Sequence, residues 1–258
     1  MGFFRNKATG ALIVIMIALV VTGLFIANKY YSSVNSAIDP RIVPARELYA
    51  KYDNYAKEGD YYKIFALLDS VEAVYKEYPH YENSFELGVI HNNRSAAYIT
   101  ILLFGDSIRA DYNPFTETDP DSLLNMAQAE VEKAISIYEG WTGNYEGKSS
   151  EQIREMIAEA FKRRIPVKEP GMVEKYLDAR AEEIVRAVEE TDRRLSVCYT
   201  NLGVIKRQRG EYEKAVRSYE KALELWDRNL SAENNMNILL GKPLKKRNII
   251  QKMFPPER

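Results

Sequence analysis

Reactive side chains are scarce in this chain. Among 258 residues there is one cysteine, Cys198, and there are two histidines, His80 and His91. A single cysteine cannot form a disulfide within the chain, so cysteine content does not indicate a redox compartment. The histidines lack zinc-site spacing, and the sequence has no phosphate loop, nucleophile elbow or kinase motif set. We therefore expect no enzyme activity, no cofactor and no metal site, and we favour a packed thiol over a nucleophile at Cys198.

An excess of charge of one sign is also lacking. The 36 Lys and Arg residues are balanced by 37 Asp and Glu residues, which gives a formal net charge of −1. Without a global basic field, we expect no nucleic-acid partner. Glycine and proline are few, at 13 and 10, and they separate apolar periodic segments. This distribution is expected for long helices joined by short turns.

The one long uncharged stretch lies near the N-terminus. Residues 8–27 contain no charged side chain, and a helix over this range, at about 1.5 Å per residue, spans the roughly 30 Å of a bilayer core. A cleaved signal peptide is the alternative. However, neither Ala27 nor Ala37 follows the small residues that such a cleavage site needs. We therefore predict an uncleaved transmembrane anchor in residues 1–30.

The basic residues around this stretch predict its orientation. Arg5 and Lys7 precede it, whereas Lys29 is the only basic residue between it and Arg41. The positive-inside rule then favours a single-pass membrane protein with a cytoplasmic N-terminus and a periplasmic or otherwise extracytoplasmic main domain. Polar residues 31–44 are predicted to be a tether. Small residues within the anchor are compatible with self-association, so a homo-oligomer is left open.

The most specific pattern occupies residues 196–229. Counted from Ser196 as position 1, its matches are Leu202, Gly203, Tyr212, Ala215, Tyr219 and Ala222 at positions 7, 8, 17, 20, 24 and 27. Small residues at positions 8, 20 and 27 let two antiparallel helices approach closely. The pattern resembles the tetratricopeptide repeat (TPR) family, without indicating a subfamily. The resemblance implies an all-α fold, an α-solenoid of helical hairpins that binds proteins or peptides.

Less exact versions of the pattern precede it. We predict two degenerate TPR-like hairpins in residues 45–142. The first has its turn at residues 59–61, and the second has residues 93–98 in its first helix and a loop insertion at 105–121. The acidic residues of this insertion do not have EF-hand spacing, so a solvated turn is favoured over a calcium site.

Residues 143–195 predict a third, irregular hairpin. Ser149 and Gln152 have the spacing of a capping box at the start of its first helix. In its second helix, Ala181 and Val188 lie one repeat length before their equivalents in the clear repeat. We interpret this second helix as the B helix of a diverged repeat, with an unrelated insertion as the alternative.

Residues 230–258 predict a capping helix and a basic tail. The helix begins at about Ala232 and stops before Gly241. A single amphipathic helix commonly covers the last apolar face of such an array. For the basic tail we favour a solvated segment over one that contacts anionic lipid or an acidic partner.

The TPR resemblance also implies a binding groove, lined mainly by the first (A) helix of each hairpin. Transferred to this chain, the candidate groove residues are Arg46, Tyr49, Asn93, Thr200, Asn201, Arg207 and Asn235. Asparagine recurs at position 6 in three units, and an amide there can donate to and accept from a peptide backbone. Bonding to a neighbouring helix is the alternative role. The Lys and Arg pattern with which some TPR proteins clamp a terminal carboxylate is missing.

These patterns lead to a functional hypothesis. We expect a membrane-tethered TPR scaffold or assembly factor, attached through residues 8–27, which binds a protein or peptide partner in its groove. A structural subunit of a membrane or envelope complex is the main alternative, and an unrecognised enzyme is less favoured.

Overall fold

A computed structural model describes residues 38–165 and 170–246, and all regular structure in these ranges is helical. The helices are α2 (Val43–Tyr49), α3 (Tyr52–Glu58), α4 (Tyr61–Lys76), α5 (Phe85–Phe104), α6 (Pro120–Tyr145), α7 (Ser150–Lys162), α8 (Pro170–Glu189), α9 (Thr191–Gln208), α10 (Tyr212–Leu225) and α11 (Leu230–Leu239). The predicted anchor at residues 8–27 lies outside the described residues. Within the described ranges, none of the helices is both long and apolar enough for a membrane span.

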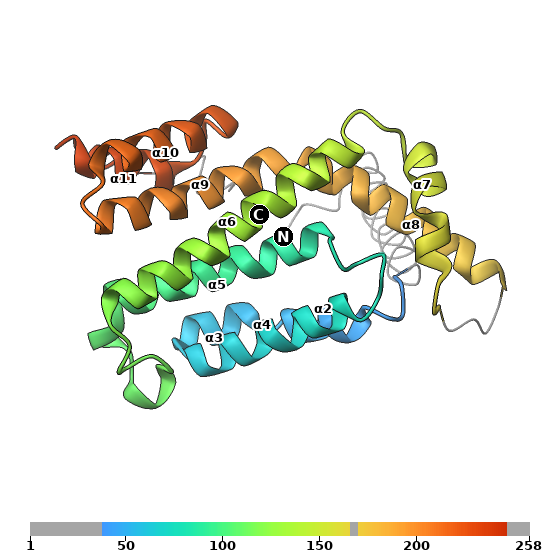
Figure 1. Ribbon diagram of the computed structural model, residues 1–258, viewed down its shortest axis with the longest axis horizontal. Coiled ribbons are helices and arrows are strands. Elements are labelled where there is room, and N and C mark those ends of the chain that lie inside the picture. Colours follow the sequence, from blue (N-terminus) through green and yellow to red (C-terminus); the bar gives the residue numbers. More distant parts are fainter. Residues whose placement is uncertain (1–37, 166–169, 247–258) are drawn as a thin grey trace, which may run out of the picture.

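Three antiparallel hairpins stack side by side (Figure 1). The pair α2 and α3 packs on α4, α5 packs on α6, and α9 packs on α10. Successive hairpins meet where α4 contacts α5 and where α6 and α5 contact α9, while α11 covers α10 and α9. This part of the chain is thus an all-α, TPR-like repeat fold.

The turns of the first and last hairpins follow from local chemistry. Gly59 ends α3 with a φ of 70°, a left-handed conformation that suits glycine. Asp60 then caps α4, because its side chain accepts the Lys63 backbone N–H at 3.0 Å. Gly210 has a φ of 75° in the turn between α9 and α10. The structure therefore contains the turn that the sequence predicts at residues 59–61.

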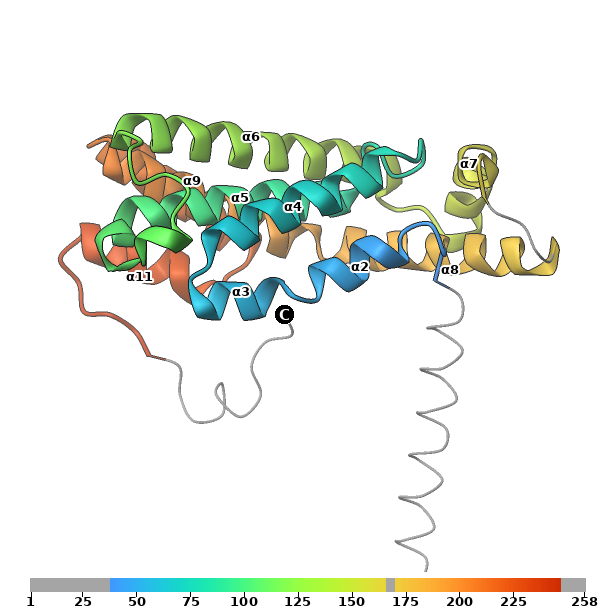
Figure 2. The same cartoon turned by 90° about the horizontal axis from the view of Figure 1, so that it is seen from below.

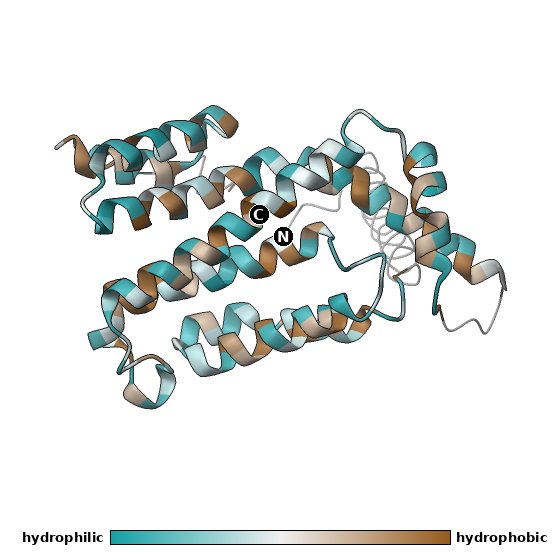
Figure 3. Cartoon of the chain, viewed as in Figure 1, coloured by the Kyte–Doolittle hydropathy of each residue, from teal (hydrophilic) through white to brown (hydrophobic). Residues whose placement is uncertain are grey.

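Close helix contacts explain the small residues. A Cβ atom added to Gly203 would lie 2.3 Å from the Tyr219 ring, so only glycine lets α9 and α10 approach this closely. In the second hairpin, the buried Ser95 hydroxyl donates to the Ala127 carbonyl at 2.8 Å. Each helix carries both polar and apolar residues (Figure 3), and α10 buries Ala215 against its neighbours.

The helices α7 and α8 form a further hairpin at one end of the molecule, beside α2 (Figure 2). Its capping box is confirmed, since the Gln152 N–H donates to Ser149 Oγ at 3.2 Å and Gln152 Oε1 accepts the Ser149 N–H at 2.9 Å. The first of these helices buries Ile153 and Phe161 on one stripe.

The interpretation of α8 as the B helix of a repeat is wrong. A B helix is followed by a turn that reverses the chain, whereas α8 runs directly into α9 (Figure 1). Glu190, between them, has a helical backbone, and its N–H donates to the Arg186 carbonyl at 3.1 Å. Its own carbonyl accepts the Arg194 N–H, also at 3.1 Å. Thus α7 and α8 are an insertion, and α8 extends the first helix of the last hairpin.

Candidate functional site

Two predicted groove asparagines lie where successive A helices meet. Asn93 of α5 donates through Nδ2 to the Tyr49 hydroxyl of α2 at 2.6 Å. Asn201 of α9 donates through Nδ2 to Asn92 Oδ1 of α5 at 2.9 Å. Each bond joins position 6 of one unit to position 5 of the preceding unit. Bonding to a neighbouring helix, the alternative role of these residues, is therefore what the geometry supports.

The third position-6 asparagine also bonds within the array. Asn235 of α11 accepts from Arg207 of α9 at 3.0 Å, and its Nδ2 donates to the Ser231 carbonyl at 2.9 Å. Arg207 and Asn235 thus meet each other instead of projecting separately into open solvent. The candidate groove is a row of A helices in the order α2, α5, α9 and α11, and side-chain hydrogen bonds join each helix to the next.

Thr200 does not line the groove. Its side chain is buried, with 4% of the residue exposed, between α9 and the start of α11. Its hydroxyl donates to the Ser196 carbonyl at 2.8 Å and accepts from Asn229 Nδ2 at 2.9 Å. The prediction for Thr200 was therefore wrong. The TPR resemblance places this register position in the groove, but here Asn229, the N-cap residue of α11, reaches back and covers it.

Arg46 contacts the insertion. Its guanidinium forms an ion pair with Glu183 of α8, which fixes α8 against α2. Arg180 lies beside this pair, with 2% of the residue exposed. It bonds Glu86 Oε1 of α5 at 2.5 Å and Glu183 Oε2 at 2.8 Å. Glu183 of α8 therefore belongs to an ionic cluster centred on the buried Arg180.

His80 completes the buried cluster. Its Nε2 accepts from Arg180 Nε at 3.0 Å, which requires that nitrogen to be unprotonated. Burial, with help from the charges of Arg180 and Arg41, lowers the pKa of His80 to about 2. The cluster thus holds the inserted helix in place and keeps His80 neutral.

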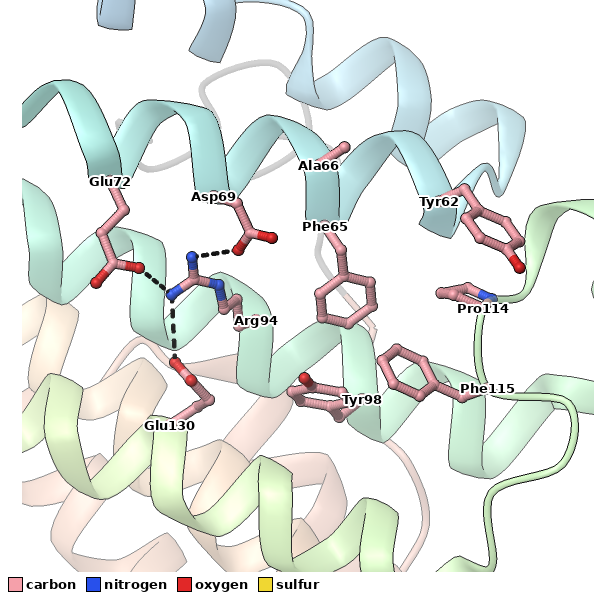
Figure 4. A pocket seen from close by; sticks show the side chains of 10 residues that line it. All are labelled: Tyr62, Phe65, Ala66, Asp69, Glu72, Arg94, Tyr98, Pro114, Phe115 and Glu130. Atoms are coloured by element: carbon pink, nitrogen blue, oxygen red, sulfur yellow. Dashed lines mark hydrogen bonds and ion pairs between the residues drawn. The ribbon is translucent and has the colours of Figure 1, made fainter.

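A cleft of about 570 Å³ opens on another side of the molecule, between α4, α5, α6 and the loop before α6 (Figure 4). One wall is aromatic, since the centroid of the Phe65 ring lies 4.7 Å from that of Tyr98 and 5.1 Å from that of Phe115. The other wall is ionic, with Arg94 at its centre. Such a combination can hold the side chain of a partner, because it offers both apolar surface and charge.

Carboxylates surround Arg94, and one of them, Glu72, is held ionised. Arg94 bonds Asp69 at 2.7 Å, forms an ion pair with Glu72 and lies 3.9 Å from Glu130 (Figure 4). Burial alone would raise the pKa of Glu72. Hydrogen bonds from Lys76 and Arg94 outweigh this effect and lower the pKa to about 2. Glu72 therefore suits recognition more than proton transfer near neutral pH. Within the described ranges, no group of three or more His, Cys, Asp and Glu side chains is placed to hold a metal ion.

Comparison with known families agrees with the helical pairing of the last hairpin. Residues 196–229 match the family model of the tetratricopeptide repeat. The chain carries a TPR. No curated protein and no solved structure matches the chain. The TPR consists of α9 and α10, with its register as the sequence places it, and it indicates a protein–protein interaction scaffold.

The ionic residues of the two clusters were not found from the sequence. Arg180 and Glu86 lie 94 residues apart, and Arg94 and Glu72 lie on different helices. A charged residue on an apolar stripe would have been the useful signal, because long charged side chains are seldom fully buried unless they are paired. Arg180 has this signal, since it lies between the buried residues Leu177 and Ile184 of α8.

Proposed function

We propose that this chain is a membrane-tethered scaffold that holds a protein or peptide partner on the row of A helices α2, α5, α9 and α11. The observation that carries this proposal is the TPR at residues 196–229, stacked in one array with two similar hairpins. A stacked array offers a long continuous surface of the kind used for polypeptide partners. The uncharged stretch at residues 8–27 supports a tether to the membrane, with the array on the extracytoplasmic side.

The open part of this surface can be located on α9. Asn201 faces α5 and Arg207 faces α11. Because successive helical residues are rotated by about 100°, Val197 and Gln208 project between these two directions. Both residues are exposed. The partner is therefore expected to contact α9 at Val197 and Gln208, between the polar bonds that join the helices.

Photocrosslinking in membranes tests this proposal. A photoreactive residue at Val197 or Gln208 should capture a second polypeptide, whereas one at Glu213, exposed on α10, should not. Equal capture at all three positions, or recovery of this chain alone, would reject a specific partner on the A-helix row. A topology reporter fused after Arg258 tests the orientation separately, and a cytoplasmic signal would reject the extracytoplasmic placement.

A further inference from the structure

The chain turns back on itself after α11. Gly241 has a φ of 63°, and the Lys242 N–H donates to the Asn237 carbonyl at 2.8 Å, which is the 6→1 bond of a Schellman motif. Residues 242–246 then run along the side of α11 without regular structure. Asn237 also donates through Nδ2 to the Pro243 carbonyl at 3.3 Å. We call residues 241–246 the tail.

Asn234 binds the backbone of this tail with both ends of its amide. Its Nδ2 donates to the Lys245 carbonyl at 3.0 Å, and its Oδ1 accepts the Lys245 N–H at 2.8 Å. Both bonds go to the main chain of one residue, so they recognise an extended segment irrespective of its side chain. Lys245 adds one side-chain contact, an ion pair with Glu233.

Asn234 occupies the same register position as residues that join successive units of the array. In the two preceding contacts, the position-5 residues Tyr49 and Asn92 accept a bond from the next unit of the array. Asn234 occupies position 5 of the last unit, with no further helical hairpin after it in the described ranges. The tail therefore stands where a next element of the array would bind.

The tail covers this surface poorly. All six of its residues are exposed, and Leu244 has 57% of its surface in contact with solvent. Ile238 and Leu240 of the same region stay 54% and 48% exposed. Because the tail is held by a few polar bonds and buries little apolar surface, another segment that made the same bonds and also covered Ile238 could replace it.

We propose that this side of α11 is a second polypeptide-binding site, which takes an extended segment with a basic residue opposite Glu233 and an apolar residue against Ile238. The tail is its intramolecular occupant and competes with the partner. This deepens the proposed function and rests on it, since it assigns to the scaffold a site at the end of the array and a partner chemistry for it.

The test uses the full chain in detergent and the synthetic peptide Gly-Lys-Pro-Leu-Lys-Lys, which repeats residues 241–246. Lys245→Pro removes the N–H that Asn234 accepts and should release the tail, whereas Lys245→Ala keeps that N–H. The peptide should shift the side-chain amide resonances of Asn234 and Asn237 in Lys245→Pro. In Lys245→Pro, half-saturation is expected at a peptide concentration of about 1 mM. In the wild type and in Lys245→Ala the tail still competes, at a roughly millimolar effective concentration, so half-saturation should need at least about fivefold more peptide.

The double variant Lys245→Pro, Asn234→Ala provides the decisive control. Peptide binding, followed there by the Asn237 resonance, should be lost while the circular dichroism stays that of a folded helical protein. The site does not exist as proposed if the peptide shifts the amide resonances in none of the variants, or if peptide binding survives Asn234→Ala. Failure of the crosslinks at Val197 would reject the A-helix row and leave this result unaffected, so the two proposals can fail separately.

Discussion

Asn201 on α9 donates its side-chain amide to Asn92 on α5 at 2.9 Å, across 109 residues of sequence. Asn93 makes the corresponding bond to Tyr49 on α2. The sequence leaves two roles open for an amide at position 6, contact with a peptide or with a neighbouring helix, and here its partner is the preceding helix of its own array. These asparagines therefore set the stacking of the A helices and so shape any surface that the helices offer.

The bond between Asn92 and Asn201 should be measurable as a coupling energy. A double-mutant cycle with Asn92→Ala and Asn201→Ala should give a coupling of about 0.5–1.5 kcal/mol in the free energy of unfolding, the usual net value of such a bond. Urea titration provides the measurement. Gln208→Ala, an exposed polar residue on the same helix, should change stability by less than about 0.5 kcal/mol. Strict additivity of the Asn92 and Asn201 variants would show that the bond contributes nothing.

Substitution by alanine should have opposite effects at Gly203, which lies in the close contact of α9 and α10, and at Gly140, which has open space beside it. Gly203→Ala would place a Cβ atom 2.3 Å from the rigid Tyr219 ring, so the helices must separate, at a cost of about 1–3 kcal/mol. Gly140 lies inside α6 with no atom within 4 Å of an added Cβ. Gly140→Ala should therefore stabilise the protein by up to about 1 kcal/mol. Thermal unfolding of both variants checks this, and a neutral Gly203→Ala would contradict the packing.

The elements that could be predicted from the sequence are those encoded by local spacing. The turn at Gly59, the capping box at Ser149 and the register of Gly203 each depend on residues close together in the chain. The course of α8 was misjudged because its apolar stripe matched a B helix, although no glycine or proline lies between Gly171 and Gly203 to end it. The partners of Arg180 could not be predicted, since periodicity does not say which distant residue a helix face meets.

The buried cation of α8 should be critical for stability. Arg180→Met would leave Glu86 and Glu183 without their main partner, and an uncompensated buried charge costs about 3–5 kcal/mol. Arg186→Met is the matched control, because Arg186 is exposed and pairs only weakly, at 3.7 Å, with Glu182. Denaturant titration should show a large loss for the first variant and less than about 0.5 kcal/mol for the second. Similar values for both would mean that Arg180 is not buried as described.

Cys198 should report unfolding. Its side chain is fully buried in the TPR, and burial raises the pKa of its thiol to about 12. Because only the thiolate reacts, iodoacetamide should leave the native protein unmodified and label it once in urea. In a Glu220→Cys variant, the added thiol on the exposed face of α10 should react at once in the native state. Mass spectrometry distinguishes these outcomes, and fast native labelling of Cys198 would contradict its burial.

His80 predicts that stability falls as the pH drops below about 6.5. In the folded state its pKa is lowered to about 2 by burial and by the charges of Arg180 and Arg41, whereas the unfolded chain has the ordinary value of about 6.5. Below that value the unfolded state binds a proton that the folded state excludes, so stability declines by up to about 1.4 kcal/mol per pH unit. His80→Gln keeps an acceptor for Arg180 but does not titrate, and it should flatten the dependence of stability on pH between pH 6.5 and 5.

The window from pH 6.5 to 5 separates His80 from the carboxylates. It lies above pH 4.5, below which protonation of Glu72, whose pKa is lowered to about 2, also destabilises the fold. Urea midpoints measured across this range decide the matter, and an unchanged slope in His80→Gln would show that His80 is not the group responsible.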